Sequence, residues 1–258
     1  MGRVIAVTNQ KGGVGKTTTA INLAASLGSL EQRVLLLDLD PQSNSTSGVG
    51  VTPAEASHTT YTFLGGSSSA DDAIVATKAD RVDVLPANRD LAGAEIELVP
   101  EQNRELILKE RISGTVSKYD FIIIDCPPSL GLLTLNALAA CQSVIIPLQC
   151  EYYAMEGVSS LVETLDMVRG SLNPDLLLEG VLLTMFDTRN SICHQVAEQA
   201  RGHFGDKVFM TVIPRNVRLS ESPSYGLPIL LYDPGSRGAQ SYLELARELL
   251  RRTAAVQP

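Results

Sequence analysis

Residues 4–18 read V-I-A-V-T-N-Q-K-G-G-V-G-K-T-T, and this stretch decides the fold. Residues 4–7 are apolar and mostly β-branched, which predicts a buried strand. The glycines that follow predict a tight loop, and the run that begins at Thr17 predicts a helix. A glycine-rich turn between a strand and a helix directs backbone N–H groups and the positive end of the helix dipole at one point. The stretch therefore predicts a phosphate-binding loop.

Two side chains after the glycines give this loop its chemistry. Lys16 can reach the outer phosphates of a nucleotide, and the Thr17 hydroxyl can ligate Mg²⁺. The usual phosphate-loop pattern is G-x-x-x-x-G-K-[ST]. Here Gln10 replaces the first glycine, and a second lysine, Lys11, lies near the start of the loop. The alternative is a chance Gly/Lys-rich turn, and the combination of strand, loop, Lys-Thr pair and helix argues against it.

Acidic residues follow two more predicted strands, R-V-L-L-L-D at 33–38 and F-I-I-I-D at 121–125. Ligands of open α/β sheets bind at the carboxyl ends of the strands, so Asp38, Asp40 and Asp125 are expected near the loop. Asp125 has the pattern of a Walker B acid, which serves the Mg²⁺ shell, often through water. Asp40 is either catalytic or a turn or helix N-cap residue. Segment 42–50, rich in Ser, Thr, Asn and Gly, is expected to be a loop that responds to the γ-phosphate.

Strand patterns alternate with helix patterns along the rest of the chain. Further strands are expected at 82–86, 143–148, 178–185 and 207–213, and helices at 103–119, 131–140, 156–168, 191–204 and 238–252. This alternation implies right-handed βαβ units. The predicted fold class is α/β, a doubly wound, mostly parallel sheet with helices on both faces, as in P-loop NTPases. Without a Pro/Ser/Gly linker, residues 1–258 are expected to form a single domain.

Composition narrows the class of partners. The chain of 258 residues is 44% hydrophobic and carries a formal net charge of −8, so any nucleic-acid binding requires a local basic patch. The four cysteines have no C-x-x-C spacing, which argues against a zinc module or disulfide framework and favours a reduced cytoplasm. The sequence shows neither a signal-peptide pattern nor an apolar run near the ~18 residues of a membrane span.

The predicted last helix has one apolar face and one face of mixed charge. The apolar positions are Ala239, Tyr242, Leu243, Ala246, Leu249 and Leu250, and the charged positions are Glu244, Arg247, Glu248 and Arg251. A membrane-surface helix would prefer a basic polar face with larger apolar anchors. This helix is therefore expected to pack on the domain.

Several stretches resemble one protein family. K-G-G-V-G-K-T-T is similar to the deviant Walker A loop of the ParA/MinD group of ATPases. The stretches D-C-P-P-S-L-G-L-L-T-L-N-A-L, Q-C-E-Y-Y-A-M-E-G, E-G-V-L-L-T-M-F-D and T-V-I-P-R-N-V-R-L-S-E-S-P-S-Y-G resemble the small Soj-like chromosomal ParA proteins. The resemblance runs nearly end to end and is more specific than the loop alone.

The resemblance implies an Mg²⁺-dependent ATPase that forms a homodimer on ATP and hydrolyses it to ADP and phosphate. It also implies non-specific binding of the dimer to double-stranded DNA, and reset by a ParB-type activator that stimulates hydrolysis. Such a protein would be cytoplasmic and nucleoid-associated, with no membrane partner. ATP is also favoured over GTP because no N-K-x-D guanine-reading motif is present.

Residue roles follow from the same resemblance. Lys11 would act on the partner's nucleotide, Lys16 would be the Walker lysine, Thr17 and Asp125 would serve Mg²⁺, and Asp40 would orient the attacking water. The nucleotide would contact Lys11, Gly12, Gly13, Val14, Gly15, Lys16, Thr17 and Thr18, with adenine near Pro214 and Asn216. Gly12 would permit close approach across the dimer. Arg189 and Arg218 match positions of the family that are implicated in DNA binding. Arg215 is added by its position, because the two polar segments follow neighbouring strands and could lie on one face, and Lys207 and Arg201 could extend that patch. Ordinary solvated or sheet-capping arginines are the alternative.

Three rival functions share the loop. The first is a MinD-like membrane-cycling ATPase in division-site placement, against which the mixed-charge last helix argues. The second is an electron-transfer ATPase of the nitrogenase iron-protein type, which requires cysteines such as Cys126 or Cys150 around an Fe–S cluster. The third is a biotin-synthesis-type ligase, for whose substrate site the sequence offers no signal.

Overall fold

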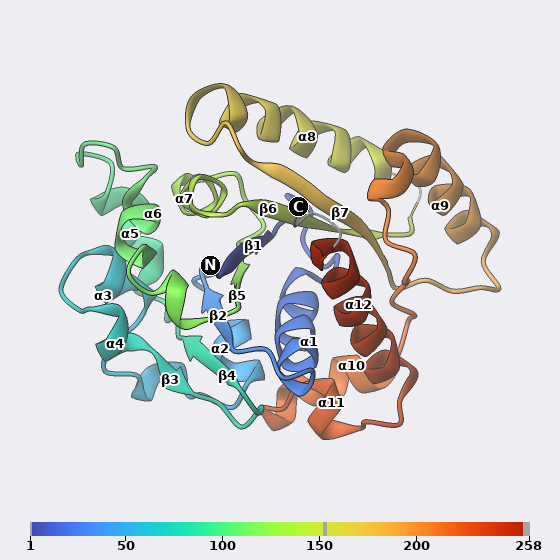
Figure 1. Ribbon diagram of the computed structural model, residues 1–258, viewed down its shortest axis with the longest axis horizontal. Coiled ribbons are helices and arrows are strands. Elements are labelled where there is room, and N and C mark those ends of the chain that lie inside the picture. Colours follow the sequence, from blue (N-terminus) through green and yellow to red (C-terminus); the bar gives the residue numbers. More distant parts are fainter. Residues whose placement is uncertain (1, 152–153, 255–258) are drawn as a thin grey trace.

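The computed structural model describes residues 2–151 and 154–254, and its centre is a seven-stranded sheet in the order β3-β4-β2-β5-β1-β6-β7 (Figure 1). The strands are β1 (Arg3–Val7), β2 (Val34–Asp38), β3 (Val75–Ala76), β4 (Val82–Leu85), β5 (Phe121–Asp125), β6 (Ser143–Gln149) and β7 (Leu177–Thr184). Every neighbouring pair is parallel except β3 with β4. The predicted α/β fold class is confirmed.

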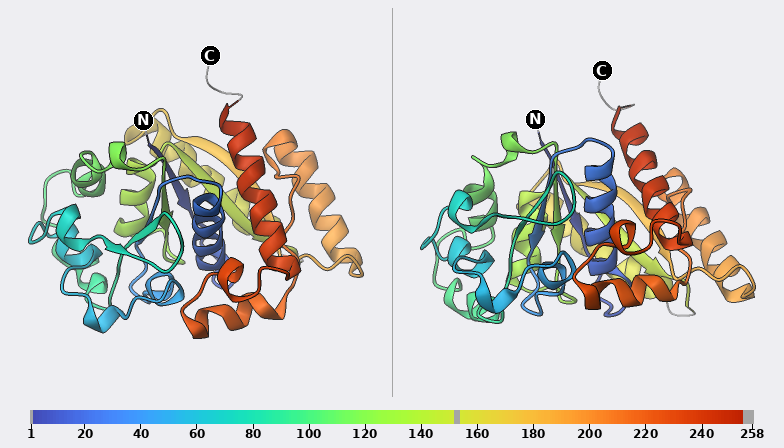
Figure 2. Two further views of the ribbon diagram at one scale, coloured as in Figure 1. Left: turned by 60° about the horizontal axis from the view of Figure 1, so that its bottom comes forward. Right: turned by 90° about the horizontal axis from the view of Figure 1, so that it is seen from below.

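Helices cover both faces of this sheet. They are α1 (Lys16–Ser29), α2 (Asn44–Gly48), α3 (Thr60–Leu64), α4 (Ala70–Ala73), α5 (Leu91–Glu97), α6 (Ile107–Ile112), α7 (Leu132–Ala140), α8 (Ala154–Ser171), α9 (Ser191–Phe204), α10 (Val217–Glu221), α11 (Ile229–Tyr232) and α12 (Arg237–Ala254). Short 3₁₀ turns lie at Pro53–Glu55, Val116–Lys118, Gly205–Lys207 and Ser222–Tyr225. Figure 2 shows α1 lying beside α12, whereas α7 and α8 lie on the other face of the sheet in Figure 1.

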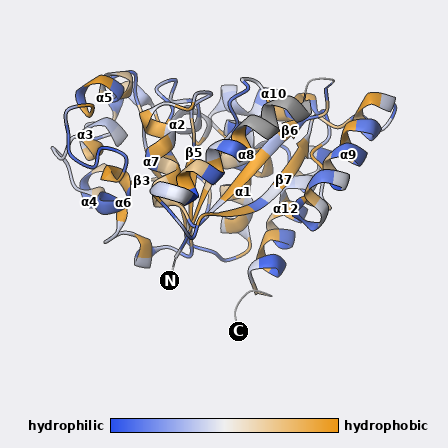
Figure 3. Cartoon of the chain, turned by 90° about the horizontal axis from the view of Figure 1, so that it is seen from above, coloured by the Kyte–Doolittle hydropathy of each residue, from blue (hydrophilic) through white to orange (hydrophobic). Residues whose placement is uncertain are grey.

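Alternating side chains of the strands feed two hydrophobic cores. On β1, Ile5 and Val7 belong to the core beneath α1 and α12, while Val4 and Ala6 belong to the core beneath α7 and α8. Figure 3 shows the result, with hydrophobic strands between helices that carry their polar residues outward. Because both faces of a parallel sheet are covered, its strands are continuous apolar runs, which is why the sequence pattern found them.

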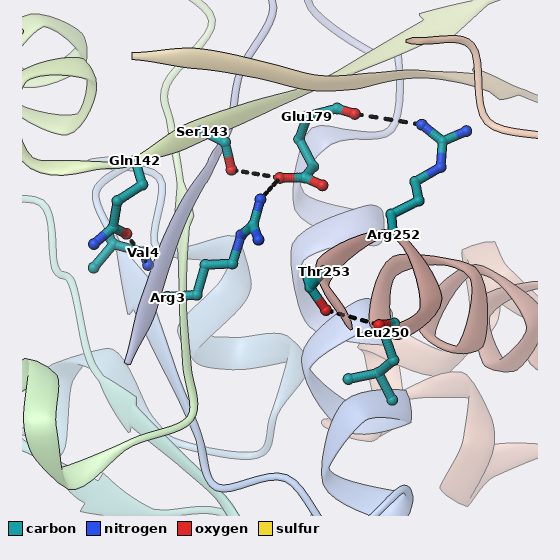
Figure 4. A network of polar contacts seen from close by, with 8 residues as sticks. All are labelled: Arg3, Val4, Gln142, Ser143, Glu179, Leu250, Arg252 and Thr253. Carbon is teal, nitrogen blue, oxygen red and sulfur yellow. Dashed lines mark hydrogen bonds and ion pairs between the residues drawn. The ribbon is translucent and has the colours of Figure 1, made fainter. Parts of the chain in front are cut away.

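The amino ends of the strands are joined by a polar network (Figure 4). The Glu179 carboxylate accepts hydrogen bonds from Arg3 Nη2 and, at 2.7 Å, from Ser143 Oγ. The Glu179 carbonyl also accepts one from Arg252 Nη1 at 3.4 Å. β1, β6, β7 and α12 are thereby tied together at the edge opposite the phosphate loop. A cavity of about 570 Å³ lies at this edge, but none of the predicted phosphate-binding residues lines it.

The predicted loop at 42–50 is wrong in part, because it contains the short helix α2. Asp38 at the end of β2 explains the helix: its carboxylate accepts hydrogen bonds from Thr46 N at 2.8 Å and Thr46 Oγ1 at 2.7 Å. Thr46 Oγ1 in turn accepts one from Ala87 N at 2.9 Å. A buried carboxylate therefore orders a segment whose composition alone predicts a loop.

The predicted helix at 103–119 is also wrong in its extent. Only α6 is α-helical there, followed by the 3₁₀ turn Val116–Lys118. Asn103 has the left-handed φ of 56°, and Gly114 interrupts the helix pattern before its end. Asn136 on α7 accepts a hydrogen bond from Leu108 N at 3.0 Å, which satisfies an amide in the first turn of α6.

The predicted last strand at 207–213 does not form a continuous ladder. Isolated parallel bridges join Val181 to Val208 and Phe186 to Pro214. On the outer side of this segment, the N–H groups of Met210 and Thr211 donate to the Glu248 carboxylate on α12, at 2.8 and 2.9 Å. A helix side chain therefore takes the place of a neighbouring strand.

α12 packs on the domain, as its apolar face predicts. Tyr242, Ala246 and Leu249 are buried, and the Tyr242 hydroxyl lies 3.2 Å from Thr19 Oγ1 on α1. Glu248 departs from the prediction, because it is buried rather than on the solvent face.

Candidate functional site

The phosphate loop has its predicted form. It leaves β1 and enters α1 through Gly13 and Gly15, which adopt left-handed φ values of 75° and 91°. Such a backbone favours glycine, so these positions explain the glycine spacing. Gly15 is the N-cap of α1 and offers no side chain to the first-turn N–H groups. The loop therefore presents open backbone donors at a helix N-terminus, the arrangement that binds phosphate.

A cavity of about 360 Å³ lies over this loop. Its lining combines the loop with three other segments of the carboxyl edge: Gly12, Gly13, Gly15, Lys16, Thr17, Thr18, Asp40, Gln42, Asn44, Pro128 and Met185. Six predicted loop residues and the predicted Asp40 therefore line one cavity, whereas the predicted Lys11 and Val14 are not among its lining residues. Met185 was not predicted; it has a left-handed φ of 50° at the end of β7.

Lys16 is a buried cation at the base of the loop, with 6% of its surface exposed. Its Nζ donates a hydrogen bond to the carbonyl oxygen of Lys11 at 3.1 Å. Burial lowers the pKa of Lys16, while the nearby carboxylates of Asp125 and Asp40 act in the opposite direction. An ammonium group held in this way is available to phosphate oxygens entering the loop.

Asp38 and Asp125 are register partners at the ends of β2 and β5, so the sheet itself brings the two carboxylates together. Burial, and next the Asp38 charge, raise the pKa of Asp125, while the side chains of Ser45 and Thr17 partly offset this. Ser45 Oγ donates to Asp125 Oδ2. Asp125 Oδ1 is buried and has no hydrogen-bond partner among the described residues.

These residues fit a magnesium ion. Mg²⁺ is held by one or two carboxylates together with water and substrate phosphates, rather than by an all-protein cage. The unpartnered Asp125 Oδ1 and the Thr17 hydroxyl at the start of α1 are the groups that could hold it. When bound, the ion would neutralise charge on the β- and γ-phosphates.

Asp40 lines the cavity and is 6% exposed. Its Oδ1 accepts a hydrogen bond from Gln42 N at 2.9 Å, and its carbonyl accepts one from Ser43 N at 2.8 Å. The turn role that the sequence left open is therefore present. The catalytic role stays a prediction, and the two roles are compatible, because a carboxylate has a second oxygen.

Lys11 contacts the Lys16 ammonium group through its carbonyl oxygen. Its Nζ forms an ion pair with Glu151 Oε2 at 2.9 Å, and both side chains are partly exposed. A Cβ placed on the neighbouring Gly12 would meet nothing within 4 Å. No contact within the described chain therefore requires glycine at position 12.

Thr184 is a site residue that the sequence did not reveal. It is buried at the end of β7, and its Oγ1 donates a hydrogen bond to the carbonyl of Val14 at 2.8 Å. It thereby fixes the phosphate loop to a strand far away in the sequence. The available signal was positional, since β7 is parallel to β1 and β6 and ends at the same edge of the sheet.

The predicted adenine residues lie at the end of segment 208–214 and just after it. Pro214 is bridged to Phe186, and Asn216 Oδ1 caps α10 by accepting a hydrogen bond from Arg218 N at 2.8 Å. Both residues are partly exposed. Their contact with a nucleotide base stays a prediction.

Arg189 pairs with the Asp187 carboxylate, and the neighbouring Phe186 carbonyl accepts a hydrogen bond from Arg215 N at 3.2 Å. Arg189 donates to Asp187 through Nε at 3.0 Å and Nη2 at 2.9 Å. Those hydrogen bonds, together with a smaller effect of the Arg215 charge, lower the pKa of Asp187 to about 2. Arg218 instead pairs with Glu221 at 2.8 Å and Asp233 at 3.4 Å. All three arginines are at the surface, as predicted, but Arg189 and Arg218 are paired with acids rather than only solvated.

Lys207 is not part of this group. It ends the 3₁₀ turn Gly205–Lys207, before the segment 208–214, whereas Arg215 follows that segment. Arg201 is exposed on α9.

The glycine loop between β1 and α1, its Lys-Thr pair and the carboxylate of the adjacent β5 define a P-loop nucleoside triphosphatase fold. No described helix is both long and apolar enough to cross a membrane. A family model described as an AAA domain matches residues 2–178.

Relatives define the class more narrowly. The sporulation initiation inhibitor protein Soj of Bacillus subtilis is 57% identical over 249 residues, covering 96% of this chain and 98% of the relative. The chromosome partitioning protein ParA of Myxococcus xanthus is 56% identical over 258 residues, covering 100% of this chain and 91% of the relative. The chain therefore belongs to the ParA/Soj family of chromosome-partitioning ATPases.

Solved structures share the fold over the whole chain. The cobyrinic acid a,c-diamide synthase of Mycobacterium smegmatis with bound ADP and magnesium superposes with a TM-score of 0.87 at 40% identity, covering 99% of this chain and 96% of that one. The septum site-determining protein MinD of Pyrococcus horikoshii, complexed with Mg-ADP, gives 0.81 at 27% identity, covering 100% and 99%.

Proposed function

We propose that residues 1–258 form a single ATPase domain that binds ATP and Mg²⁺, dimerises on ATP, and then binds double-stranded DNA without sequence preference. A ParB-type activator stimulates hydrolysis and returns the protein to the monomer. The cycle would run in the cytoplasm, on the nucleoid. The observation that carries the proposal is the buried Lys16 beside an unpartnered Asp125 oxygen under an open glycine loop.

The proposed binding of ATP and Mg²⁺ is supported by the charged groups around the loop and by the cavity over it. The loop donors and Lys16 suit the phosphates, while Thr17 and Asp125 suit Mg²⁺, and Asp40 lines the same cavity as the loop. Solved neighbours at 40% and 27% identity contain ADP with magnesium, which supports the same ligands here.

The proposed dimerisation is supported by two residues of the loop, Gly12 and Lys11. Gly12 has free space around it in the described chain, so a second protomer is the reason we infer for its lack of a side chain. Lys11 is an exposed cation next in sequence to Gly12, which lines the nucleotide cavity. A lysine so placed is suited to act on the nucleotide of a partner.

A MinD-like membrane-cycling ATPase is the first rival, and the lower identity of 27% to the solved MinD disfavours it. The burial of Tyr242, Ala246 and Leu249 on α12 leaves less of that helix for a membrane. Pelleting with liposomes in the presence of ATP discriminates: recovery of the protein with lipid would favour this rival.

Other chemistries on the same fold are less well supported. An amide-forming synthase is suggested by the solved structure at 40% identity, yet the partition proteins reach 56–57% over the same length. For an iron–sulfur protein, Cys126 would have to face a partner, and it is fully buried. A colourless preparation that does not convert an acid substrate to its amide would exclude both.

The deciding experiment is co-sedimentation with DNA in the presence of ATP, ADP or no nucleotide. The proposal expects binding with ATP alone, at similar affinity for unrelated sequences. The Lys16→Ala variant should lose both nucleotide binding and DNA binding, because it removes the cation from the phosphates. DNA binding that is independent of nucleotide, or confined to one sequence, would contradict the proposal.

A further inference from the structure

Lys11 is held by three contacts within its own protomer. Its Nζ forms the ion pair with Glu151 Oε2 at 2.9 Å, and its carbonyl oxygen accepts the hydrogen bond from Lys16 Nζ at 3.1 Å. Its N–H group also donates to Asn9 Oδ1 at 3.0 Å. Backbone and side chain of Lys11 are therefore both fixed on the carboxyl edge of the sheet.

Glu151 is itself held in place to receive the lysine. Gln149, the last residue of β6, donates its Nε2 to Glu151 Oε1, which leaves Oε2 for Lys11. The N–H of Glu151 also donates to the Gln149 carbonyl at 2.8 Å. The acceptor is thus aimed by the strand that runs beside β1.

To act on the nucleotide of a partner protomer, the Lys11 ammonium group would have to leave its position beside Glu151. In the proposed function, on which this inference rests, Lys11 acts on the nucleotide of the partner. One ammonium group engaged with Glu151 of its own chain is not free to do so. Phosphate oxygens entering the loop would compete with the Lys11 carbonyl for Lys16, which loosens the contact between Lys11 and Lys16.

We propose that Glu151 is a positioning residue that holds Lys11 in cis in the monomer and thereby raises the ATP concentration needed for two protomers to join. Binding of ATP removes the Lys16 contact first. Dimerisation then breaks the Lys11–Glu151 pair in each protomer and releases both lysines towards the opposite nucleotide.

The size of the effect follows from exposure. Lys11 and Glu151 side chains are 42% and 48% exposed, so their pair is solvent-screened. Exposed ion pairs shift an equilibrium by about 1.5- to 5-fold. Because two pairs break in each dimer, the dimer dissociation constant should shift by about 2- to 25-fold. Salt should reduce this shift, since the pair is screened.

Glu151→Gln is the test variant, because it removes the charge and keeps the shape. Glu31→Gln is its matched control: Glu31 pairs with Arg81 at 2.6 Å in an exposed position at the other end of β2. Both variants change the net charge of the chain equally. They differ only in whether the pair involves Lys11.

The first measurement needs neither dimer nor nucleotide. Nucleotide-free protein is treated briefly with acetic anhydride, and modification of Lys11 is followed by peptide mass spectrometry against Lys109 as internal reference. An amine held in an ion pair is less available, so Glu151→Gln should raise Lys11 modification by about 1.5- to 5-fold, and Glu31→Gln should not. Unchanged Lys11 modification in Glu151→Gln would overturn the proposal.

The second measurement is the dimer dissociation constant by analytical ultracentrifugation with a non-hydrolysable ATP analogue. Glu151→Gln should dimerise more tightly than wild type and Glu31→Gln, and the gain should vanish in a Lys11→Ala background, as a double-mutant cycle requires. An equal gain in that background, or weaker dimerisation, would overturn the role of Glu151. A wild-type protein that stays monomeric at every analogue concentration would instead overturn the proposed function.

Discussion

At the scale of single residues, Thr184 has a larger role than its sequence context suggests. One hydrogen bond, from Thr184 Oγ1 to the Val14 carbonyl at 2.8 Å, joins the end of β7 to the phosphate loop. The contact is buried, so its loss cannot be repaired by solvent without movement. From Thr184 the chain continues through Met185, which lines the cavity, to the Asp187 that pairs with Arg189.

Thr184→Val is therefore expected to weaken the loop while keeping the shape of the side chain. The Val14 carbonyl would lose its donor, at a cost of about 1–3 kcal/mol in the free energy of unfolding. Urea unfolding measures that loss, and calorimetry should show weaker ATP binding. The control is Thr188→Val, at an exposed threonine in the turn after β7. Wild-type nucleotide affinity in Thr184→Val would show that the hydrogen bond does not shape the loop.

Asp40 can be dissected because its two roles use different chemistry. Asp40→Asn keeps an oxygen for the Gln42 N–H and removes the negative charge. Turnover should fall on the order of 10²–10⁴-fold, with stability close to wild type, and the ATP-bound dimer should accumulate. Phosphate release and gel filtration with ATP measure both effects. A variant that stays monomeric with ATP, or one that hydrolyses normally, would leave Asp40 as a turn residue only.

The sequence predicts those site residues that lie close together in the chain. The loop glycines, Lys16 and Thr17 are neighbours in the chain, so their spacing carries the chemistry. Thr184 at the end of β7 and Glu151 just after β6 contact the loop at sequence separations of 170 and 140 residues. Nothing in their local sequence specifies such a contact, because it is created by the order of strands in the sheet.

At the scale of elements, apolar patterns succeeded where burial alone decides the structure. β2 and β5 are continuous apolar runs and were found, as was α9 with its predicted bounds. Apolar patterns failed at 207–213, where the Glu248 carboxylate, and not another strand, accepts hydrogen bonds from the N–H groups of Met210 and Thr211. The sequence pattern also failed for α2, because one buried carboxylate, Asp38, orders this helix.

The contact of Glu248 on α12 with segment 207–213 makes the stability of the fold depend on pH. Burial alone would raise its pKa, but the N–H groups of Met210 and Thr211, together with Arg252, lower the pKa of Glu248 below its ordinary value. A lowered pKa in the folded state means that the ionised carboxylate stabilises the fold above about pH 4.5. That contribution is lost as the pH falls through the folded-state pKa.

Glu248→Gln should consequently destabilise the protein by about 1.5–3 kcal/mol at pH 7, the range for hydrogen bonds to a charged group. The difference from wild type should shrink below pH 4.5, where the wild-type carboxyl also takes up a proton. Urea unfolding across pH 3–8 measures it. Glu244→Gln, at an exposed residue of the same helix that pairs with Arg247, is the control. A pH-independent difference would assign the effect to shape rather than charge.

At the scale of the whole molecule, DNA binding has to overcome a net charge of −8. Arg189 and Arg218 each face a carboxylate within the monomer, so DNA phosphates would have to displace Asp187, Glu221 and Asp233. A monomer should bind weakly. In the proposed function, a dimer would present the arginines twice to one duplex, which would raise affinity through effective concentration.

The double variant Arg189→Glu, Arg218→Glu should bind all DNA sequences more weakly while still dimerising on ATP. Affinity of the wild type should fall with salt at a log–log slope of about −0.9 per phosphate contacted, and the slope should be shallower in the variant. Filter binding over a salt series measures both. Undiminished binding by the double variant would place the DNA surface elsewhere.

The carboxylate of Glu248 also bears on how copies of this chain can and cannot assemble. A sheet whose outermost N–H groups are open can recruit a strand from another molecule and aggregate edge to edge. On the β7 side, the two N–H groups of Met210 and Thr211 are already occupied by Glu248. On the opposite side, β3 has only the two residues Val75 and Ala76, too short to offer a template. Both sides of the sheet are thereby poor templates for a strand from another molecule, and growth of fibres edge to edge through the sheet is disfavoured.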